Sequence, residues 1–182
     1  MHNEPIVMPG QPARVVCAVG FLAAASFVLM QVGLQMPGAH YLVYEPSDVP
    51  ALVGTFTMGP MAGLAIVALR NVLRVMVHPD LFGLAINCIA SGLYVGAAGV
   101  LYRRLHTQTG AVIALAIATA IQAVAMTALN AVLLPLWMGL SGGALTRMLF
   151  VFVLPFNLLK GAANGTLTYL LYKRISHFFP RV

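Results

Sequence analysis

The sequence predicts an all-α integral membrane protein built as a six-transmembrane-helix bundle. Of its 182 residues, 60% are apolar and only 8% are charged, with a mean hydropathy of +0.92. A soluble domain is roughly half apolar and a quarter charged. The apolar residues are also gathered in runs of about 20, the length that crosses a bilayer as a helix. We therefore expect residues 1–182 to form a single transmembrane domain.

Four spans follow directly from uninterrupted apolar runs, at about 14–35, 81–103, 110–134 and 153–173. The apolar block 49–77 is too long for one simple span and contains GPMAG at 59–63, where proline and glycine interrupt it. It predicts a short helix at about 48–58 and a longer one at about 61–77. The segment from Pro135 to Leu154 is too irregular for a clean span and fits a loop, a short helix or a lid.

Basic residues near the predicted helix ends indicate that both termini are cytoplasmic. With the N-terminus inside, the cytoplasmic side receives Arg14, Arg103, Arg104, Lys173, Arg174 and Arg181. The formal charge of +6 comes from residues scattered at helix ends rather than from a basic patch, so no nucleic-acid partner is expected. Cys17 and Cys88 lie in apolar segments without metal-ligand spacing, and we interpret them as packing residues.

The last span carries three polar residues in its first half, Asn157, Lys160 and Asn164. Their i, i+3, i+7 spacing places them on one helical face, which points inward if lipid covers the other. Lys160 precedes Lys173 by thirteen residues, about 20 Å along a helix, so it lies in the outer half of the bilayer. An ionisable residue there suggests a functional site. The alternative is that Lys160 snorkels and the amides join helices.

Two further asparagines fit the same site. Asn130, near the outer end of the fifth span, is expected at the depth of the stripe, and Asn87 on the fourth span could join it. Asparagine amides suit a ligand edge that mixes donors and acceptors. Arg70 and Arg74 are interpreted as structural, either facing the outer headgroups or pairing with Asp80 or Glu45.

The predicted outer loop PGAHYLVYEPSDVPAL supplies Tyr41 and Tyr44, whose flat faces suit an aromatic ligand or a membrane interface. Asp48 is a candidate ligand contact with a structural alternative, because Ser47 or Asp48 could cap the helix that follows. The sequence contains no GxxxxGK[ST] phosphate loop and no HExxH or nucleophile-elbow motif. Binding, rather than catalysis, is what these residues support, and no cofactor or metal is expected.

Three stretches carry a resemblance to a known family: YEPSDVPALVGTFTMGPMAGL, ALRNVLRVM and PFNLLKGAANGTLTYLLYKR. The chain resembles the substrate-binding membrane subunits (S components) of energy-coupling factor (ECF) vitamin transporters, and within them the riboflavin-specific branch. The resemblance implies a multi-pass protein of a prokaryotic plasma membrane that binds riboflavin from outside. It also implies as partners a transmembrane coupling subunit and two cytoplasmic ATPases.

Carried over residue by residue, the resemblance implies ligand contacts at Asn130, Asn157, Lys160, Asn164, Tyr41, Leu42 and Tyr44. It also implies that a small-residue motif facing the coupling subunit falls on Gly20 and Ala24, with glycine in place of the family's first alanine. Two alternatives remain: an S component for another small vitamin or for flavin mononucleotide, whose phosphate Lys160 could meet, and a membrane scaffold without a ligand.

Overall fold

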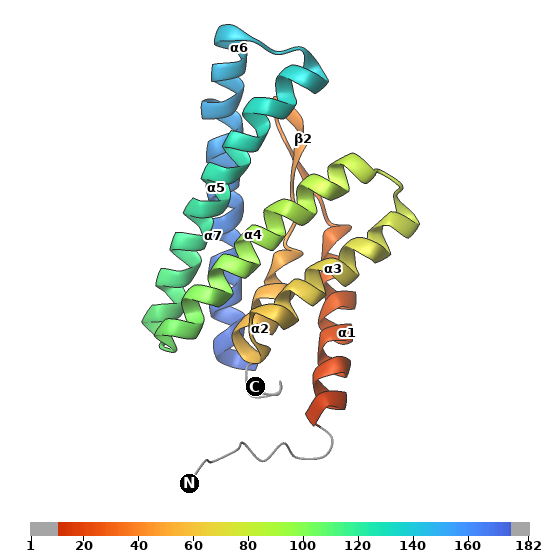
Figure 1. The fold of residues 1–182 in the computed structure, drawn as a ribbon, viewed down its shortest axis with the longest axis vertical. Coiled ribbons are helices and arrows are strands. Elements are labelled where there is room, and N and C mark those ends of the chain that lie inside the picture. The colour runs from red at the N-terminus through yellow and green to blue at the C-terminus, as the bar shows by residue number, and fades with distance from the viewer. Residues whose placement is uncertain (1–10, 176–182) are drawn as a thin grey trace.

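The computed structural model describes residues 11–175 as a helical bundle with one β-hairpin (Figure 1). Arg181 and the residues around it lie outside the described part. The elements in chain order are α1 (Gln11–Met30), β1 (Leu34–Met36), β2 (Ala39–Tyr44), α2 (Asp48–Met58), α3 (Pro60–Val77), α4 (Leu81–Leu105), α5 (Gln108–Met138), α6 (Gly142–Arg147), the π-helix η1 (Met148–Val153) and α7 (Leu154–Ile175).

Within this part of the chain, five helical stretches are long and apolar enough to cross a membrane: Ala13–Met30, α3, α4, α5 and the continuous run Gly142–Tyr172. The predicted helix at 48–58 exists with those bounds, but its 11 residues rise only about 16 Å, half of a hydrocarbon core. The bundle therefore has five long helices and one short one.

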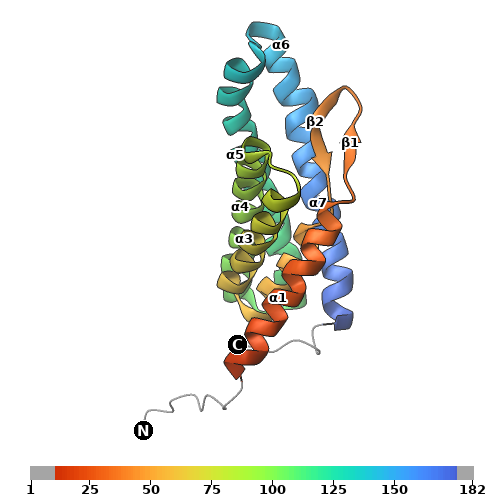
Figure 2. The ribbon, with the colours of Figure 1, turned by 90° about the vertical axis from the view of Figure 1, so that its right-hand side faces the viewer.

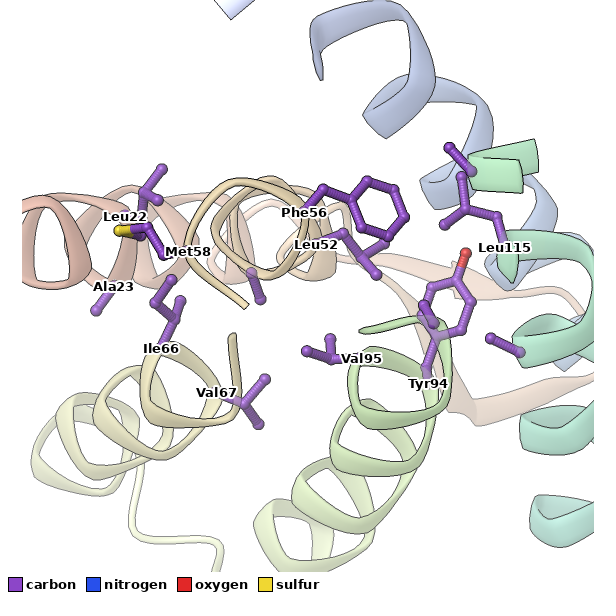
Figure 3. Close-up of a cluster of buried hydrophobic side chains, with 14 residues drawn as sticks. Leu22, Ala23, Leu52, Phe56, Met58, Ile66, Val67, Tyr94, Val95 and Leu115 are labelled. Atoms are coloured by element: carbon purple, nitrogen blue, oxygen red, sulfur yellow. The ribbon is translucent and has the colours of Figure 1, made fainter. Parts of the chain in front are cut away.

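Helix α2 is the centre of the molecule, and all of its residues are buried. Figure 3 shows Leu52 and Phe56 on the side of α2 that faces Tyr94 of α4 and Leu115 of α5. Met58 lies on the side that faces Leu22 of α1 and Ile66 of α3. A helix that is apolar on every side is either a membrane span or a buried core helix, and the complete burial of this short helix by protein makes it a core helix. The short helix is thus a buried plug that the longer helices enclose.

The interruption predicted at GPMAG is a sharp junction between α2 and α3. Gly59 adopts φ 93°, a backbone conformation that favours glycine, and Pro60 occupies the first turn of α3, where its missing N–H costs nothing. These two residues reverse the chain direction and let α3 pack against α2. The prediction of two helices from one apolar block is confirmed.

The sequence prediction is wrong at the end of the first span. We expected a helix over 14–35, but α1 ends at Met30 and residues 34–44 form an antiparallel hairpin, with Leu34 opposite Tyr44. Gly38, at φ 84°, makes the turn. Apolar Leu34 extended the hydrophobic run, although it belongs to a strand.

The outer segment 135–154 also differs from a simple loop. Helix α5 continues through Pro135 to Met138, Gly139 ends it at φ 66°, and helical structure resumes at Gly142. Cys17 and Cys88 are both exposed, so the interpretation of these cysteines as packing residues is wrong.

Figures 1 and 2 show that α5 and the continuous α6–η1–α7 helix extend beyond the other helices at the end where the hairpin lies. There the hairpin packs through Ala39 and Leu42 onto Leu134 of α5 and onto Val153 and Phe156 of the η1–α7 helix. The start of α1 and the end of α7 lie at the opposite end of the molecule (Figure 1). The hairpin therefore covers one end of the bundle.

Candidate functional site

The polar residues of α7 line its buried face. Asn157, Lys160 and Asn164 are 5%, 6% and 0% exposed, whereas Leu159 between them is 70% exposed. The helix thus turns its amides and its ammonium group into the protein and its leucines outward, the arrangement expected in lipid. The prediction of an inward polar stripe is confirmed.

Asn164 joins this stripe to the chain that follows the hairpin. The Tyr44 hydroxyl donates a hydrogen bond to Asn164 Oδ1 at 3.2 Å. In turn, Asn164 Nδ2 donates to the Glu45 carbonyl oxygen and to Asp48 Oδ2, each at 3.3 Å. Burial, with a contribution from the Asp48 carboxylate, raises the pKa of Tyr44, so its hydroxyl remains a donor at neutral pH.

Glu45 is a buried carboxylate on which three helices converge. Its side chain lies 3.7 Å from Lys160 Nζ of α7 and 3.5 Å from Arg74 of α3, and it accepts a hydrogen bond from Asn87 of α4. The Arg74–Glu45 pair is one of the pairings that the sequence suggested. Glu45 belongs to the outer loop that the sequence placed at the mouth of the site, but it was not predicted as a ligand contact.

A second ion pair lies beneath the first and is fully buried. Arg70 donates to Asp48 Oδ1 at 2.7 Å, and its guanidinium also donates to Ser26 of α1 and Ser91 of α4. This guanidinium therefore bonds to α1, α2 and α4 from its place on α3. Pairing of Arg70 with Glu45 or Asp80, or exposure to headgroups, was the wrong expectation.

The predicted side-chain cap of α2 is absent, since no such bond from Ser47 or Asp48 is seen in the described chain. Asp48 uses its carboxylate for Arg70 and Asn164 instead. Asp80 caps α4 by accepting from the Gly83 amide at 3.0 Å. An acid before a helix can thus serve either as a cap or as an ion-pair partner, and the local sequence does not distinguish the two.

These three ion pairs make one charged cluster, which we call the acid–base cluster: Glu45, Asp48, Arg70, Arg74 and Lys160. Two carboxylates face three cations, so its formal charge is +1. Burying charge is costly unless each group has a partner. Every member of this cluster has at least one, and Arg74, at 31% side-chain exposure, is the most accessible.

Two other asparagines also face the interior. Asn157 donates to the Val153 carbonyl at 2.9 Å, and Asn130 donates to the Met126 carbonyl at 2.8 Å. An amide has a second N–H and a carbonyl oxygen beyond that bond. Helices α5 and α7 run antiparallel (Figure 1). Gly161 lies level with Thr119, because a Cβ at Gly161 would touch the Thr119 side chain. This register places Asn130 about 10 Å outward of Asn157 rather than level with it.

Aromatic side chains stand at the outer end of the cluster. Tyr41 meets Trp137 edge to face, with ring centroids 6.1 Å apart, and Phe82 lies 5.6 Å from the same indole. Leu42 points into the apolar layer beneath the hairpin. The Tyr41 hydroxyl is buried, and no partner for it occurs among residues 11–175.

The structure leaves the remaining predicted residues apart from this site. Gly20 and Ala24 are exposed on α1, and nothing in the described chain lies within 4 Å of a Cβ placed on Gly20. No group of three or more His, Cys, Asp or Glu that could hold a metal ion occurs in residues 11–175. The arrangement is that of a binding site: buried amides and charges on α4, α5 and α7, under an aromatic hairpin.

Comparison with known proteins gives consistent matches along nearly the whole chain. The family model described as "ECF transporter, substrate-specific component" matches residues 14–172. The riboflavin transporter FmnP of Bacillus subtilis is 34% identical over 155 residues, covering 79% of this chain and 82% of the relative. The riboflavin transporter RibU of Staphylococcus aureus is 30% identical over 172 residues, covering 90% and 91%.

A solved structure of the S component of a bacterial ECF transporter superposes with a TM-score of 0.81 at 30% identity. The match covers 92% of this chain and 98% of that one.

Proposed function

Because the chain belongs to the family of substrate-specific components of ECF transporters, we propose that it binds riboflavin from outside the cell for ATP-driven uptake. The chain is a multi-pass protein of the bacterial plasma membrane and a transporter subunit rather than an enzyme. The observation that carries the proposal is the buried polar face of Asn157, Lys160 and Asn164 beneath the hairpin. Two relatives named riboflavin transporters narrow the ligand to a flavin.

The chemistry of riboflavin fits these residues. Its isoalloxazine ring is flat, apolar along one side, and carries a pyrimidine edge of alternating carbonyl acceptors and an N–H donor. Asparagine amides complement such an edge, and tyrosine faces cover such a ring. The Lys160 ammonium donates strong hydrogen bonds to carbonyls or hydroxyls. We assign ligand contacts to Asn130, Asn157, Lys160, Asn164, Asn87, Tyr41, Leu42 and Tyr44.

Asp48 receives a different assignment. Its carboxylate is fully buried and already bonded to Arg70 and Asn164. We assign it to positioning: it fixes the Asn164 amide, and Asn164 contacts the ligand.

Transport requires partners that hydrolyse ATP, since the chain has no phosphate-binding loop. We propose an ECF module of one transmembrane coupling subunit and two cytoplasmic ATPases. Gly20 and Ala24 are exposed on α1, and small residues four apart allow a partner helix to approach closely. We assign this face of α1 to the coupling subunit.

Flavin mononucleotide is a second candidate ligand, favoured by one observation. The acid–base cluster carries a formal surplus of one positive charge, which a phosphate would balance.

Purification without added ligand tests the proposal. We expect the protein in mild detergent to retain a yellow flavin, and the stripped protein to quench riboflavin fluorescence stoichiometrically. Parallel titration with flavin mononucleotide distinguishes the two flavins. A colourless protein that folds but quenches neither would contradict the proposal.

A further inference from the structure

Gln122 of α5 is a buried amide that the site described above does not use. Its side chain is 1% exposed, among the most deeply buried polar groups of the chain. Among residues 11–175, no group donates a hydrogen bond to its Oε1 atom. Buried side-chain carbonyls in folded proteins nearly always accept from protein, ordered water or a ligand, so this acceptor is available to a partner from outside the chain.

The level of Gln122 in the bundle follows from a close contact between α4, α5 and α7. The Tyr94 hydroxyl of α4 donates to the Gly161 carbonyl of α7 at 2.7 Å, and a Cβ at Gly161 would lie 2.6–3.1 Å from side-chain atoms of Thr119 on α5. Tyr94 is fully buried. The three helices therefore touch at the level of Gly161, between Lys160 and Asn164 of the polar stripe.

Gln122 lies one turn outward of this contact, since it follows Thr119 by three residues on a helix that runs toward the hairpin end (Figure 1). On α7, Asn157 and Lys160 precede Gly161 and lie outward of it by the same reasoning. On α4, Ser91 precedes Tyr94 by three residues. Gln122 is thus at the level of the polar stripe, just above the point where the helices meet.

Its polar neighbours at this level are all partnered. Lys160 pairs with Glu45, Asn157 donates to the Val153 carbonyl, and Ser91 accepts from Arg70. The glutamine side chain is long, and its amide group offers two donors and an acceptor.

We propose that Gln122 is a further ligand-contacting residue, level with Asn157 and Lys160, that binds a neutral donor-bearing group of the flavin. The inference rests on the proposed function, because it deepens the same site. A donor on the ligand, such as an imide N–H or a ribityl hydroxyl, would satisfy Oε1, and the Gln122 N–H groups would meet a neighbouring acceptor. The unpaired Gln122 carbonyl then destabilises the ligand-free protein but not the ligand-bound protein.

Gln122→Met provides the test, because methionine keeps the length and volume of the side chain and removes only its hydrogen-bonding atoms. Riboflavin binding is measured by fluorescence quenching, and thermal stability with and without riboflavin is measured in detergent. We expect riboflavin affinity to fall about tenfold, equivalent to about 1.4 kcal/mol. We also expect the ligand-free protein to melt at the wild-type temperature or above, because the variant loses an unpaired buried carbonyl.

Asn71→Leu is the matched control. Asn71 is also a buried amide with an unpartnered carbonyl in the described chain, but it lies on α3, which packs against α1, α2 and α4. We expect its riboflavin affinity to remain that of the wild type. An equal loss of affinity in both variants would indicate a general loosening of the bundle and would overturn the inference.

Unchanged affinity in Gln122→Met would overturn the inference and leave the proposed function standing. A lower melting temperature of its ligand-free form, with unchanged affinity, would assign Gln122 to packing and also overturn it. If Gln122→Met does not accumulate, Gln122→Asn retracts the amide by one carbon: weaker binding supports the inference and wild-type binding overturns it. Wild-type protein that binds no riboflavin would refute the proposed function and this inference together.

Discussion

The Lys160 ammonium group lies near the Glu45 carboxylate and, in the proposed site, would also contact the ligand. Its ammonium lies 3.7 Å from Glu45 Oε1, longer than a charge-assisted hydrogen bond. Arg74 and Asn87 also hold Glu45, so the carboxylate does not depend on the lysine. The geometry therefore allows Lys160 to donate to a ligand while Glu45 stays neutralised.

Lys160→Met tests this reading of the residue. We expect riboflavin affinity to fall roughly 10- to 100-fold, because a hydrogen bond from a charged donor contributes about 1.5–3 kcal/mol. Folded yield should remain near that of the wild type, since Arg74 still balances Glu45. Titration of riboflavin fluorescence measures the affinity. Wild-type affinity together with a large loss of folded protein would instead show that Lys160 only joins helices.

Arg70 is a structural residue, and its removal should be expensive. Arg70→Met leaves the Asp48 carboxylate buried without its cation, and breaking such a pair from one side costs about 3–5 kcal/mol. We expect a large drop in melting temperature in detergent, of which Arg70→Met combined with Asp48→Asn recovers a substantial part. A double variant no more stable than Arg70→Met would show that the charge on Asp48 is not the cause.

Residue spacing on one helix was predictable, whereas pairing between helices was not. The stripe on α7 followed from the i, i+3, i+7 rule because all of its members share one helix. The partner of Arg70 lies 22 residues earlier, on α2, and only the packing of α2 against α3 selects it. Asp80 and Glu45 were equally reasonable partners from the sequence.

At the scale of elements, helix boundaries were predicted correctly where proline and glycine together interrupt an apolar run. GPMAG separated α2 from α3 correctly, since only Gly59 and Pro60 can make that junction without strain. The hairpin was missed because Leu34 of β1 continued the apolar run of the first span, and β2 was interpreted as part of an outer loop. Pro135 misled in the other direction, because α5 continues through it.

The close approach of α5 and α7 depends on Gly161. A Cβ there would lie 2.6 Å from Thr119 Cγ2 and 2.8 Å from its Oγ1. We expect Gly161→Val to lower stability by about 1–3 kcal/mol through overpacking, and added Thr119→Ala to restore part of it. Melting in detergent measures both variants. A Gly161→Val protein as stable as the wild type would mean that the two helices separate freely.

At the scale of the whole molecule, the ligand site and the proposed partner face are on different helices. The proposed ligand site lies among the hairpin, α4, α5 and α7, and the proposed partner face lies on α1. Short helix α2 contacts both α1 and α7. The acid–base cluster ties α2 to α3 and to α7 as well. A structural change at the proposed ligand site could therefore be transmitted through the packing of α2 to the proposed partner face.

Ala24→Leu should separate binding from assembly. Ala24 is exposed on α1, so the larger side chain meets no part of the described chain's core, and riboflavin affinity should be unchanged. Copurification with the coupling subunit should fall, because a leucine keeps the partner helix at a distance. Ala128→Leu, at an exposed position on α5, is the control, and this variant should assemble normally. Equal assembly of both variants would remove Ala24 from the interface.

Orientation in the membrane remains a prediction from charge. The first turn of α1 carries Arg14, the last turn of α4 carries Arg103 and Arg104, and these helix ends lie at the end of the molecule away from the hairpin (Figure 1). The positive-inside rule makes that end cytoplasmic. A C-terminal fluorescent-protein fusion should therefore be bright and an alkaline phosphatase fusion inactive, and the reverse result would invert the protein.

Binding of riboflavin at the polar face beneath the hairpin has a built-in reporter. Trp137, the only tryptophan of the chain, stands beside Tyr41 at the outer end of the site. A bound flavin accepts the excitation energy of a nearby indole. Titration of riboflavin should therefore quench Trp137 emission to a plateau at equimolar ligand, and Lys160→Met should need more ligand for the same quenching. Quenching that rises without saturation, equally in both proteins, would contradict the account.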